Sequence, residues 1–317
     1  MTFSAQAKRE LCRFEPESVC CNLAELSGII SAAGAVIYRG HGQKRLCIET
    51  ENNAVIRRAY KLLKQVFEVS PELVTLRHTR LGGKNTYRLL LENQEADFVL
   101  QGCGIDMQRR TVPKEVTARK CCRMSFLRGV FLACGSVTDP EKEYHLEMVL
   151  SDERFAESVA KLMGKFELNA HLTERRKMTL VYLKGQTGIT DFLSMLGAHS
   201  ARFAMEDVLI RKELRNNANR AVNCDSANVQ RALTAAEAQM ESIQYLLKRC
   251  GKESLPPELQ EAAALRLENP ELSLEELGKL CDPPLGKSGI YHRLKKIQTI
   301  AGEMKSREKE SQNGTDH

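Results

Sequence analysis

A group of basic and polar side chains near the end of the sequence has the residue types that bind nucleic acid. Asp282 and Glu303 enclose twenty residues that include no acidic side chain. Lysine and arginine neutralise phosphates, whereas side chains at the start of a recognition helix reach base edges in the major groove. The candidate base contacts are Lys287, Ser288, Tyr291 and His292, and the candidate phosphate contacts are Arg293, Lys295 and Lys296. The segment therefore predicts double-stranded DNA as a partner.

A helix-turn-helix would position these side chains. Residues 273–276 (Ser-Leu-Glu-Glu) form a capping box, which begins a short helix. Residues 281–286 form a turn that is longer than in most such motifs, and a second helix begins at Lys287 or Ser288. Its inner face carries Ile290, Leu294, Ile297 and Ala301. The alternative is a packing hairpin with a solvated basic face, because such pairs of helices also serve as purely structural elements.

Cysteine is the other residue type in this chain that could react or bind a metal. The chain has eleven cysteines, an odd and scattered set that includes the vicinal pairs Cys20-Cys21 and Cys121-Cys122. Reduced, mostly buried thiols are the main interpretation. The sequence has no C-x-x-C or H-x-x-x-H spacing, so it predicts no zinc site. A redox role for the two vicinal pairs is the alternative.

The cysteine pairs belong to a repeat. Residues 26–34 (LSGIISAAG) and 127–135 (LRGVFLACG) lie 101 residues apart, and each is preceded by a cysteine pair at the same spacing. This constant offset indicates a duplicated structural unit. Gly28 and Gly129 would let two helices approach closely. Gly34 and Gly135 are expected to end those helices as caps with a left-handed backbone.

Both repeats resemble the LAGLIDADG helix of homing endonucleases. The resemblance implies that the two helices pack across a pseudo-twofold axis and that the eighth residue of each is a metal-binding aspartate. Here these positions hold Ala33 and Cys134, which offer no hard carboxylate oxygens. We therefore expect a retained scaffold without catalytic residues, metal or cofactor. The alternative is an endonuclease that has recruited another acid, such as Glu25 or Asp139.

The periodicity of the intervening segments supports two similar halves. The expected strands of the first half are 35–38, 45–50, 73–79 and 86–91, with a helix at 53–67 and a turn at Gly82-Gly83. The second half repeats this order, with strands at 144–150, 168–172 and 178–183 and helices through 162–166 and 189–196. Each half is thus predicted as α-β-β-α-β-β-α. The fold class is α+β, with a duplicated LAGLIDADG-like domain followed by an all-α helix-turn-helix domain.

The whole chain resembles one family, the WhiA proteins of Gram-positive bacteria, whose pattern is a degenerate LAGLIDADG domain followed by a helix-turn-helix. Residues 121–142 carry the most specific match, and the similarity extends from about Phe3 to Met304. The resemblance implies a DNA-binding regulator connected with sporulation in some lineages, and with cell division and chromosome segregation in others. A scaffold that binds a regulatory protein partner while the helix-turn-helix holds it on DNA is the alternative.

These patterns divide the chain into domains. We expect an N-terminal arm (1–19), a first half (20–100), a linker (101–120) and a second half (121–210). An asparagine-rich interdomain linker (211–225) precedes a helical domain (226–304), whose first helix is capped by Ser226, and a disordered tail (305–317) ends the chain.

Charge and hydropathy set the expected partners. The net charge is +6, and residues 1–221 hold 34 basic against 26 acidic side chains. Several basic clusters fall on predicted strands and turns: Arg39-His41-Lys44-Arg45, Arg77-His78-Arg80-Lys84-Arg88, Gln108-Arg109-Arg110 and Arg175-Arg176-Lys177-Lys184. A saddle-shaped sheet carrying them would fit a nucleic-acid backbone, and a solvated face balanced by acids is the alternative. Without a long apolar run we expect a cytoplasmic, nucleoid-associated protein with no membrane partner and no small-molecule substrate.

Overall fold

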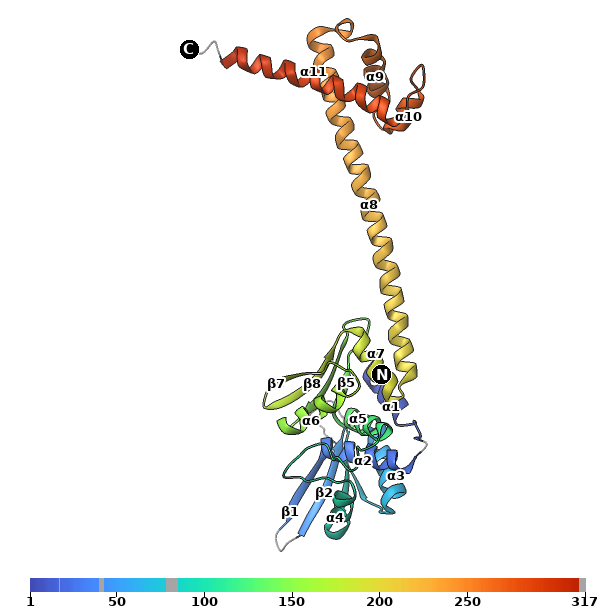
Figure 1. The fold of residues 1–317 in the computed structure, drawn as a ribbon, viewed down its shortest axis with the longest axis vertical. Helices are drawn as coiled ribbons and strands as arrows, with labels where there is room; N and C mark the ends of the chain where they lie inside the picture. Colours follow the sequence, from blue (N-terminus) through green and yellow to red (C-terminus); the bar gives the residue numbers. More distant parts are fainter. Residues whose placement is uncertain (17, 40–42, 78–84, 314–317) are drawn as a thin grey trace. The chain divides into compact units, whose positions relative to one another are not determined.

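The protein divides into two compact units, residues 1–212 and 213–317, in a computed structural model (Figure 1). The structure describes the backbone of residues 1–16, 18–39, 43–77 and 85–313, and side chains through residue 308 outside those gaps. The predicted turn at Gly82-Gly83 and four residues of the basic clusters lie outside the described residues, namely His41, His78, Arg80 and Lys84.

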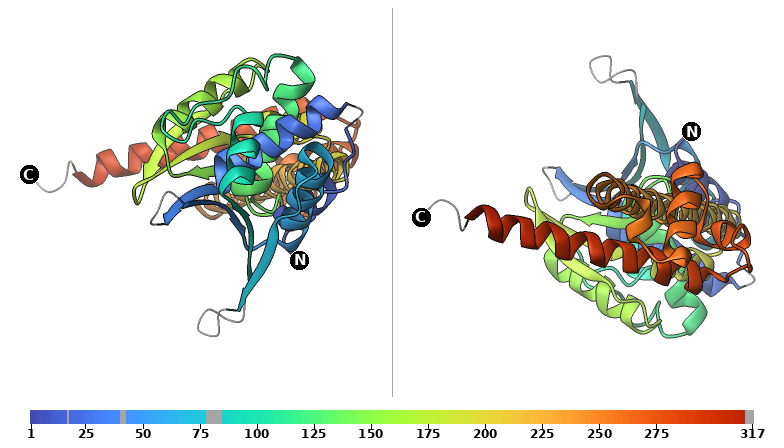
Figure 2. Two further views of the ribbon diagram at one scale, coloured as in Figure 1. Left: turned by 90° about the horizontal axis from the view of Figure 1, so that it is seen from below. Right: turned by 90° about the horizontal axis from the view of Figure 1, so that it is seen from above.

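The first unit contains two four-stranded antiparallel sheets with the same strand order. The first sheet, ordered β1-β2-β4-β3, consists of β1 (Gly34–Arg39), β2 (Gln43–Thr50), β3 (Glu72–Arg77) and β4 (Asn85–Glu92). The second sheet, ordered β5-β6-β8-β7, consists of β5 (Gly135–Val137), β6 (His145–Leu150), β7 (His171–Arg175) and β8 (Met178–Lys184). The shared order confirms the predicted duplication, and Figure 2 shows the strands of the two halves as separate ribbons.

Matching helices connect the strands of each half. The side chain of Asn52 caps α3 (Asn53–Phe67), and that of Asp152 caps α6 (Glu153–Gly164) at the corresponding place. Two further helices, α4 (Asn93–Gly102) and α7 (Gln186–Leu196), follow the last strand of each half. Inward-facing leucines are paired at equivalent positions of the two sheets, Leu46 with Leu91 and Leu146 with Leu183. The predicted α-β-β-α-β-β-α layout is therefore confirmed.

The two repeat helices, α2 (Val19–Ala33) and α5 (Lys120–Cys134), pack directly against each other. A Cβ atom placed on Gly28 would lie 2.2 Å from the carbonyl oxygen of Phe126, and one on Gly129 would lie 2.0 Å from that of Glu25. These glycines therefore permit the close approach that the sequence predicts. The expectation for Gly34 and Gly135 is wrong in its geometry, because both helices end there with an extended backbone, at φ −84° and −79°.

The expected N-terminal arm is part of the fold. Residues Phe3–Leu11 form a helix, α1, because the side chain of Thr2 caps its first turn and Ala7 and Leu11 are fully buried. These two side chains join the hydrophobic core of the second half. A second core fills the first half around Leu26, Ile29 and Ile30 of α2.

The expected linker at 211–225 contains the division between the two units, but it is helical rather than irregular, because it lies within one continuous helix, α8 (His199–Cys250). Ser226 consequently lies inside a helix rather than at its start. Asparagine and arginine are tolerated within helices, and no glycine or proline occurs between Gly197 and Gly251. Gly197, with a left-handed backbone at φ 97°, ends α7 just before α8, and Gly251, at φ 76°, follows the end of α8.

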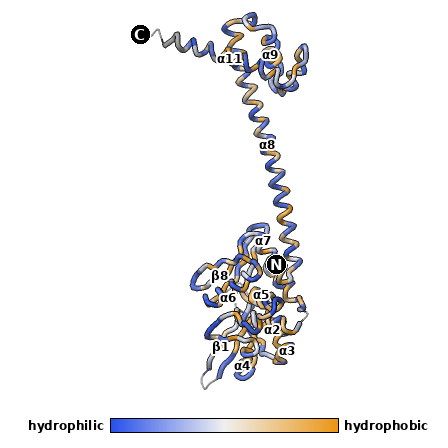
Figure 3. The backbone as a smooth tube through the Cα atoms, viewed as in Figure 1, coloured by the Kyte–Doolittle hydropathy of each residue, from blue (hydrophilic) through white to orange (hydrophobic). Residues whose placement is uncertain are grey.

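None of the helices in the described part of the chain is both long enough and apolar enough to cross a membrane. Figure 3 shows why for α8, the longest of them, along which hydrophilic and hydrophobic residues alternate.

The second unit packs the end of α8 with α9 (Pro257–Glu268), α10 (Leu274–Lys279) and α11 (Lys287–Asn313). The predicted inner face of α11 is confirmed, since Ile290, Leu294 and Ile297 are fully buried. The expected disordered tail is wrong for residues 305–313, which continue α11. Glu308 explains part of this extension, because it accepts a hydrogen bond from the Tyr245 hydroxyl at 2.8 Å and pairs with Arg249 at 3.1 Å.

Candidate nucleic-acid interface

The predicted helix-turn-helix is formed by α10, the turn at 281–286 and α11. The capping box is present, with the Ser273 hydroxyl accepting from the backbone N–H of Glu276 and the Glu276 carboxylate accepting from that of Ser273. After α10 the chain returns onto that helix, where the N–H of Leu285 donates to the carbonyl of Gly278 at 2.8 Å. This contact fixes the point from which α11 begins at Lys287.

Gly278 is essential to the turn because its neighbour is backbone rather than a flexible side chain. A Cβ atom on this residue would lie 2.2 Å from the Leu285 carbonyl oxygen. We expect Gly278→Ala to destabilise the second unit by about 1–3 kcal/mol, the usual range for an overpacked contact. Gly302→Ala is the control, since nothing lies within 4 Å of a Cβ at this helical position. Thermal unfolding of both variants tests the expectation, and equal melting temperatures would contradict it.

Glu261 on α9 joins the turn to α11. One carboxylate oxygen accepts from the backbone N–H of Asp282 at 2.7 Å, and the other pairs with Nη1 of Arg293 at 2.7 Å. The hydrogen bond from Asp282, with the guanidinium beside it, lowers the pKa of this carboxyl. Sequence spacing gave no signal for Glu261, because its partners lie 21 and 32 residues away.

Arg293 is therefore not placed as the sequence analysis expects. Its side chain is 17% exposed and its guanidinium is held by Glu261 within the domain. An arginine engaged in this way orients α11 instead of reaching a phosphate. Its contacts support a positioning role for Arg293, and its phosphate contact stays an untested prediction.

The other six predicted residues share the outer surface of α11. Lys287, Ser288, Tyr291, His292, Lys295 and Lys296 are all exposed. The rings of Tyr291 and His292 meet edge to face with centroids 5.8 Å apart. We call these six residues the basic face of α11. Among the described side chains, none of its three lysines has an acidic partner within ion-pair distance, so their charges are available to an anionic ligand.

Several basic residues on the first sheet are paired with acids, unlike the lysines of the basic face. Arg88 pairs with Glu49 at 2.5 Å, Arg45 pairs with Glu92 and Lys44 pairs with Asp97. Three cations of the first sheet are therefore balanced by acids, whereas Arg39 and Arg77 are exposed at the ends of β1 and β3. On the second sheet, the ring of Tyr182 lies between those of His145 and His171, at centroid distances of 5.7 and 5.4 Å. The ion pairs of the first sheet support the solvated-face alternative for Lys44, Arg45 and Arg88.

The two positions that the LAGLIDADG resemblance assigns to metal-binding aspartates lie at the ends of α2 and α5. Ala33 is partly buried against the core of the first half. Burial raises the pKa of the Cys134 thiol to about 12, and its Sγ atom lies 3.3 Å from the Val130 carbonyl oxygen. A protonated thiol and a methyl group cannot replace two carboxylates as ligands for a hard cation.

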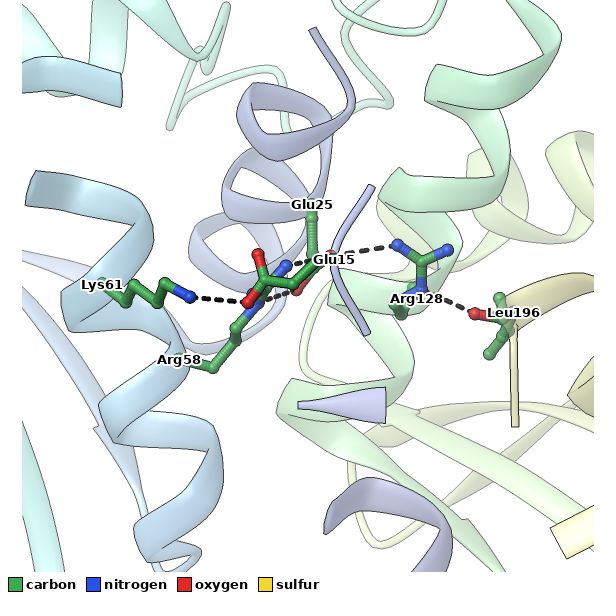
Figure 4. A network of polar contacts seen from close by, with 6 residues as sticks. All are labelled: Glu15, Glu25, Arg58, Lys61, Arg128 and Leu196. Carbon is green, nitrogen blue, oxygen red and sulfur yellow. Dashed lines mark hydrogen bonds and ion pairs between the residues drawn. The ribbon is translucent and has the colours of Figure 1, made fainter. Parts of the chain in front are cut away.

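Glu25 and Asp139, the two alternative acids, are engaged in other contacts. Glu25 is fully buried, and its carboxylate pairs with Arg58 at 2.7 Å and with Arg128 at 3.1 Å (Figure 4). Arg128 in turn donates to the carbonyl of Leu196 at 2.7 Å. Asp139 is exposed and caps a turn by accepting from the N–H of Glu141 at 3.0 Å. Both carboxylates thus have structural partners.

Family models identify three consecutive regions of the chain. The WhiA N-terminal LAGLIDADG-like domain matches residues 19–106, the WhiA LAGLIDADG-like domain matches residues 123–215, and the WhiA C-terminal HTH domain matches residues 218–301.

Whole-chain relatives agree with the family models. A protein of Alkaliphilus metalliredigens named probable cell division protein WhiA is 39% identical over 310 residues, which cover 95% of this chain and 98% of the relative. A protein of the same name from Desulforamulus reducens is 40% identical over 312 residues, covering 96% and 97%. The crystal structure of full-length WhiA from Thermatoga maritima matches with a TM-score of 0.60 and 28% identity, covering 96% and 99% of the two chains. These matches show that the chain belongs to the WhiA family.

Proposed function

We propose that the protein is a non-catalytic, double-stranded-DNA-binding factor of cell division, acting as a transcriptional regulator or as a chromosome-associated protein on the nucleoid. The observation that carries the proposal is the basic face of α11, exposed beside a capped α10 in a domain that matches the WhiA HTH model. The relatives' name, probable cell division protein, supports the cellular role. Chromosome segregation and sporulation are the finer roles that the same proposal includes.

Each residue of the basic face has a proposed contact. Lys287 and Ser288 open α11, and Tyr291 and His292 follow one turn later, so these four side chains would meet base edges in the major groove. Lys295 and Lys296 lie a further turn along and would neutralise phosphates. Ala33 and Cys134 stand where the resemblance expects metal-binding aspartates, which supports DNA binding without DNA cleavage.

Reversing the three lysine charges tests this proposal. We expect the combined variant Lys287→Glu, Lys295→Glu and Lys296→Glu to lose about 100-fold or more in affinity for duplex DNA at low salt. The slope of log affinity on log salt should become shallower by about 2 units, because Lys295 and Lys296 are the proposed phosphate contacts and each lost contact removes roughly 0.9. Fluorescence anisotropy of labelled duplex, titrated against the full chain at several salt concentrations, measures both quantities.

A variant of equal charge controls for the general electrostatic field. Lys64, Lys161 and Lys165 are exposed on or beside the helices that flank the sheets of the first unit. Replacing all three by glutamate changes the net charge by the same amount and should leave most of the affinity intact. If both variants bind equally well, the basic face is not the DNA contact and the proposal fails. Cleavage of the duplex on adding magnesium would contradict the non-catalytic assignment.

A further inference from the structure

The structure brings the two vicinal cysteine pairs together. The Sγ atoms of Cys20, Cys21, Cys121 and Cys122 all lie within 4.8 Å of one another. Cys21 is in hydrogen-bond contact with Cys121, and Cys20 with Cys122, so both pairs meet across the two helices. Cys121 is exposed, whereas Cys21 and Cys122 are buried, which gives the cluster one open side.

The spacing of these four sulfurs suits a tetrahedral metal ion. Zinc–sulfur bonds of about 2.3 Å place the sulfurs of a tetrahedral site about 3.8 Å apart. The Sγ atoms of Cys121 and Cys122 already lie 3.9 Å apart, although the residues are adjacent in sequence. The remaining sulfurs lie within 4.8 Å of one another, so their separations exceed that of a tetrahedral zinc site by at most about 1 Å.

Hydrogen-bond donors surround the cluster, although burial raises the pKa of the Cys21 and Cys122 thiols. The cysteines occupy the first turns of α2 and α5, where backbone N–H groups lack helical partners and the helix dipole is positive. Neither helix has an acidic residue in its first turn or a side chain that caps it. The guanidinium of Arg119 lies 4.0 Å from the Cys20 sulfur, and the Ser125 hydroxyl hydrogen-bonds Cys21. These donors would stabilise thiolates bound to a metal.

We propose that these four cysteines form a structural zinc site that joins the two halves of the duplicated domain. Each repeat supplies two ligands, and the site lies at the opposite end of α2 and α5 from the lost metal-binding positions. The sequence predicts no zinc site because zinc ligands are usually recognised by their spacing along one segment, whereas here they come from segments 101 residues apart. Bound zinc would hold the starts of α2 and α5 together and release protons as the thiols become ligands.

The first experiment measures metal and thiols in the full chain. Protein without a histidine tag is purified under anaerobic conditions, and its zinc is quantified by inductively coupled plasma mass spectrometry. We expect about one zinc per chain, with all cysteines titrating as free thiols once the protein is denatured with chelator. A chain with less than about a tenth of that zinc, or with iron in its place, would overturn the proposal, as would a disulfide within the cluster.

The second experiment identifies the ligands. We expect Cys121→Ser and Cys20→Ser to weaken zinc binding by about tenfold or more in a chelator competition, at least the loss seen when supporting groups of metal sites are removed. Cys224→Ser and Cys250→Ser are matched controls at exposed cysteines of the second unit and should retain the zinc. Equal retention in all four variants would overturn the assignment.

A spectroscopic probe separates ligation from a general effect on folding. Metal-free protein is titrated with Co²⁺ alone, whose absorption spectrum shows tetrahedral thiolate coordination directly. We expect this spectrum in the parent and in Cys250→Ser, and a weaker, shifted spectrum in Cys121→Ser, which keeps three of the four sulfurs. Failure of the folded parent to give a tetrahedral thiolate spectrum would contradict the site. Amide hydrogen exchange at residues 19–23 and 120–124 should also slow when zinc is added.

Discussion

Glu25→Gln should destabilise the first unit by about 3–5 kcal/mol, because it leaves buried Arg128 without an acidic partner and buried Arg58 with only the exposed Glu15. The Glu25 carboxylate is 0% exposed, and Arg58 and Arg128 are only 2% and 3% exposed. Glutamine keeps the shape of the side chain, so the loss measures charge rather than packing. Hydrogen exchange of α2 and α5 peptides in the full chain reports the free energy of opening this unit separately from the other.

The control lies at the exposed edge of the same network. Glu15 pairs with Lys61 at 2.5 Å and reaches Arg58 at 3.4 Å, but its side chain is 54% exposed (Figure 4). Water screens such a pair, so Glu15→Gln should cost no more than about 1 kcal/mol. A similarly small change for Glu25→Gln would show that water reaches the buried group and that the network contributes little.

The buried network also explains why the duplicated halves are not interchangeable. At the repeat spacing, the counterpart of Glu25 is Phe126 and the counterpart of Arg128 is Ser27. Phe126 is fully buried in the core of the second half, and Ser27 donates to the Cys103 carbonyl at 2.9 Å. The ion pair thus forms once across the pseudo-twofold axis. Its position favours pairing of the first half with the second over pairing of two like halves.

The sequence predicts those features of the fold that short-range signals encode. The repeat spacing, the alternation of apolar residues and the Ser273–Glu276 capping box led to the sheets, the paired glycine helices and the helix-turn-helix. Each of these signals depends on residues close in the chain, or on one pattern occurring twice. The same kind of signal predicts which residues of α11 face outward, because the spacing of Ile290, Leu294 and Ile297 defines the inner face of the helix.

Features that depend on distant partners could not be predicted. The sequence predicts that Arg293 is a surface cation, and only the fold places Glu261 beside it. The segment 211–225 reads as a linker by composition, yet the absence of glycine and proline lets α8 continue through it. The cysteine pairs show their common site only when α2 and α5 are side by side. For Arg293 and for the cysteine pairs, the deciding contact joins residues more than one helical turn apart, whereas the absence of glycine and proline around residues 211–225 is a local signal.

Gly129→Ala should separate the two repeat helices and destabilise the first unit by about 3 kcal/mol, the upper part of the range for overpacked cores. The added methyl carbon would lie 2.0 Å from the Glu25 carbonyl oxygen and 2.9 Å from the Ile29 backbone nitrogen. Both neighbours belong to the backbone of α2, so no side-chain rotation can relieve the contact. Because Glu25 is itself displaced, the ion pairs to Arg58 and Arg128 should weaken together with the packing.

Gly188→Ala on α7 separates this steric effect from helix propensity. Nothing lies within 4 Å of a Cβ atom at Gly188, and alanine favours a helix over glycine by about 1 kcal/mol. Gly188→Ala should therefore stabilise the first unit or leave its stability unchanged, whereas Gly129→Ala should destabilise it. Hydrogen exchange of the α5 amides measures both effects. A cost at Gly129 no larger than that at Gly188 would mean that α2 and α5 can separate freely, which would also remove the geometric basis for four thiols converging at their first turns.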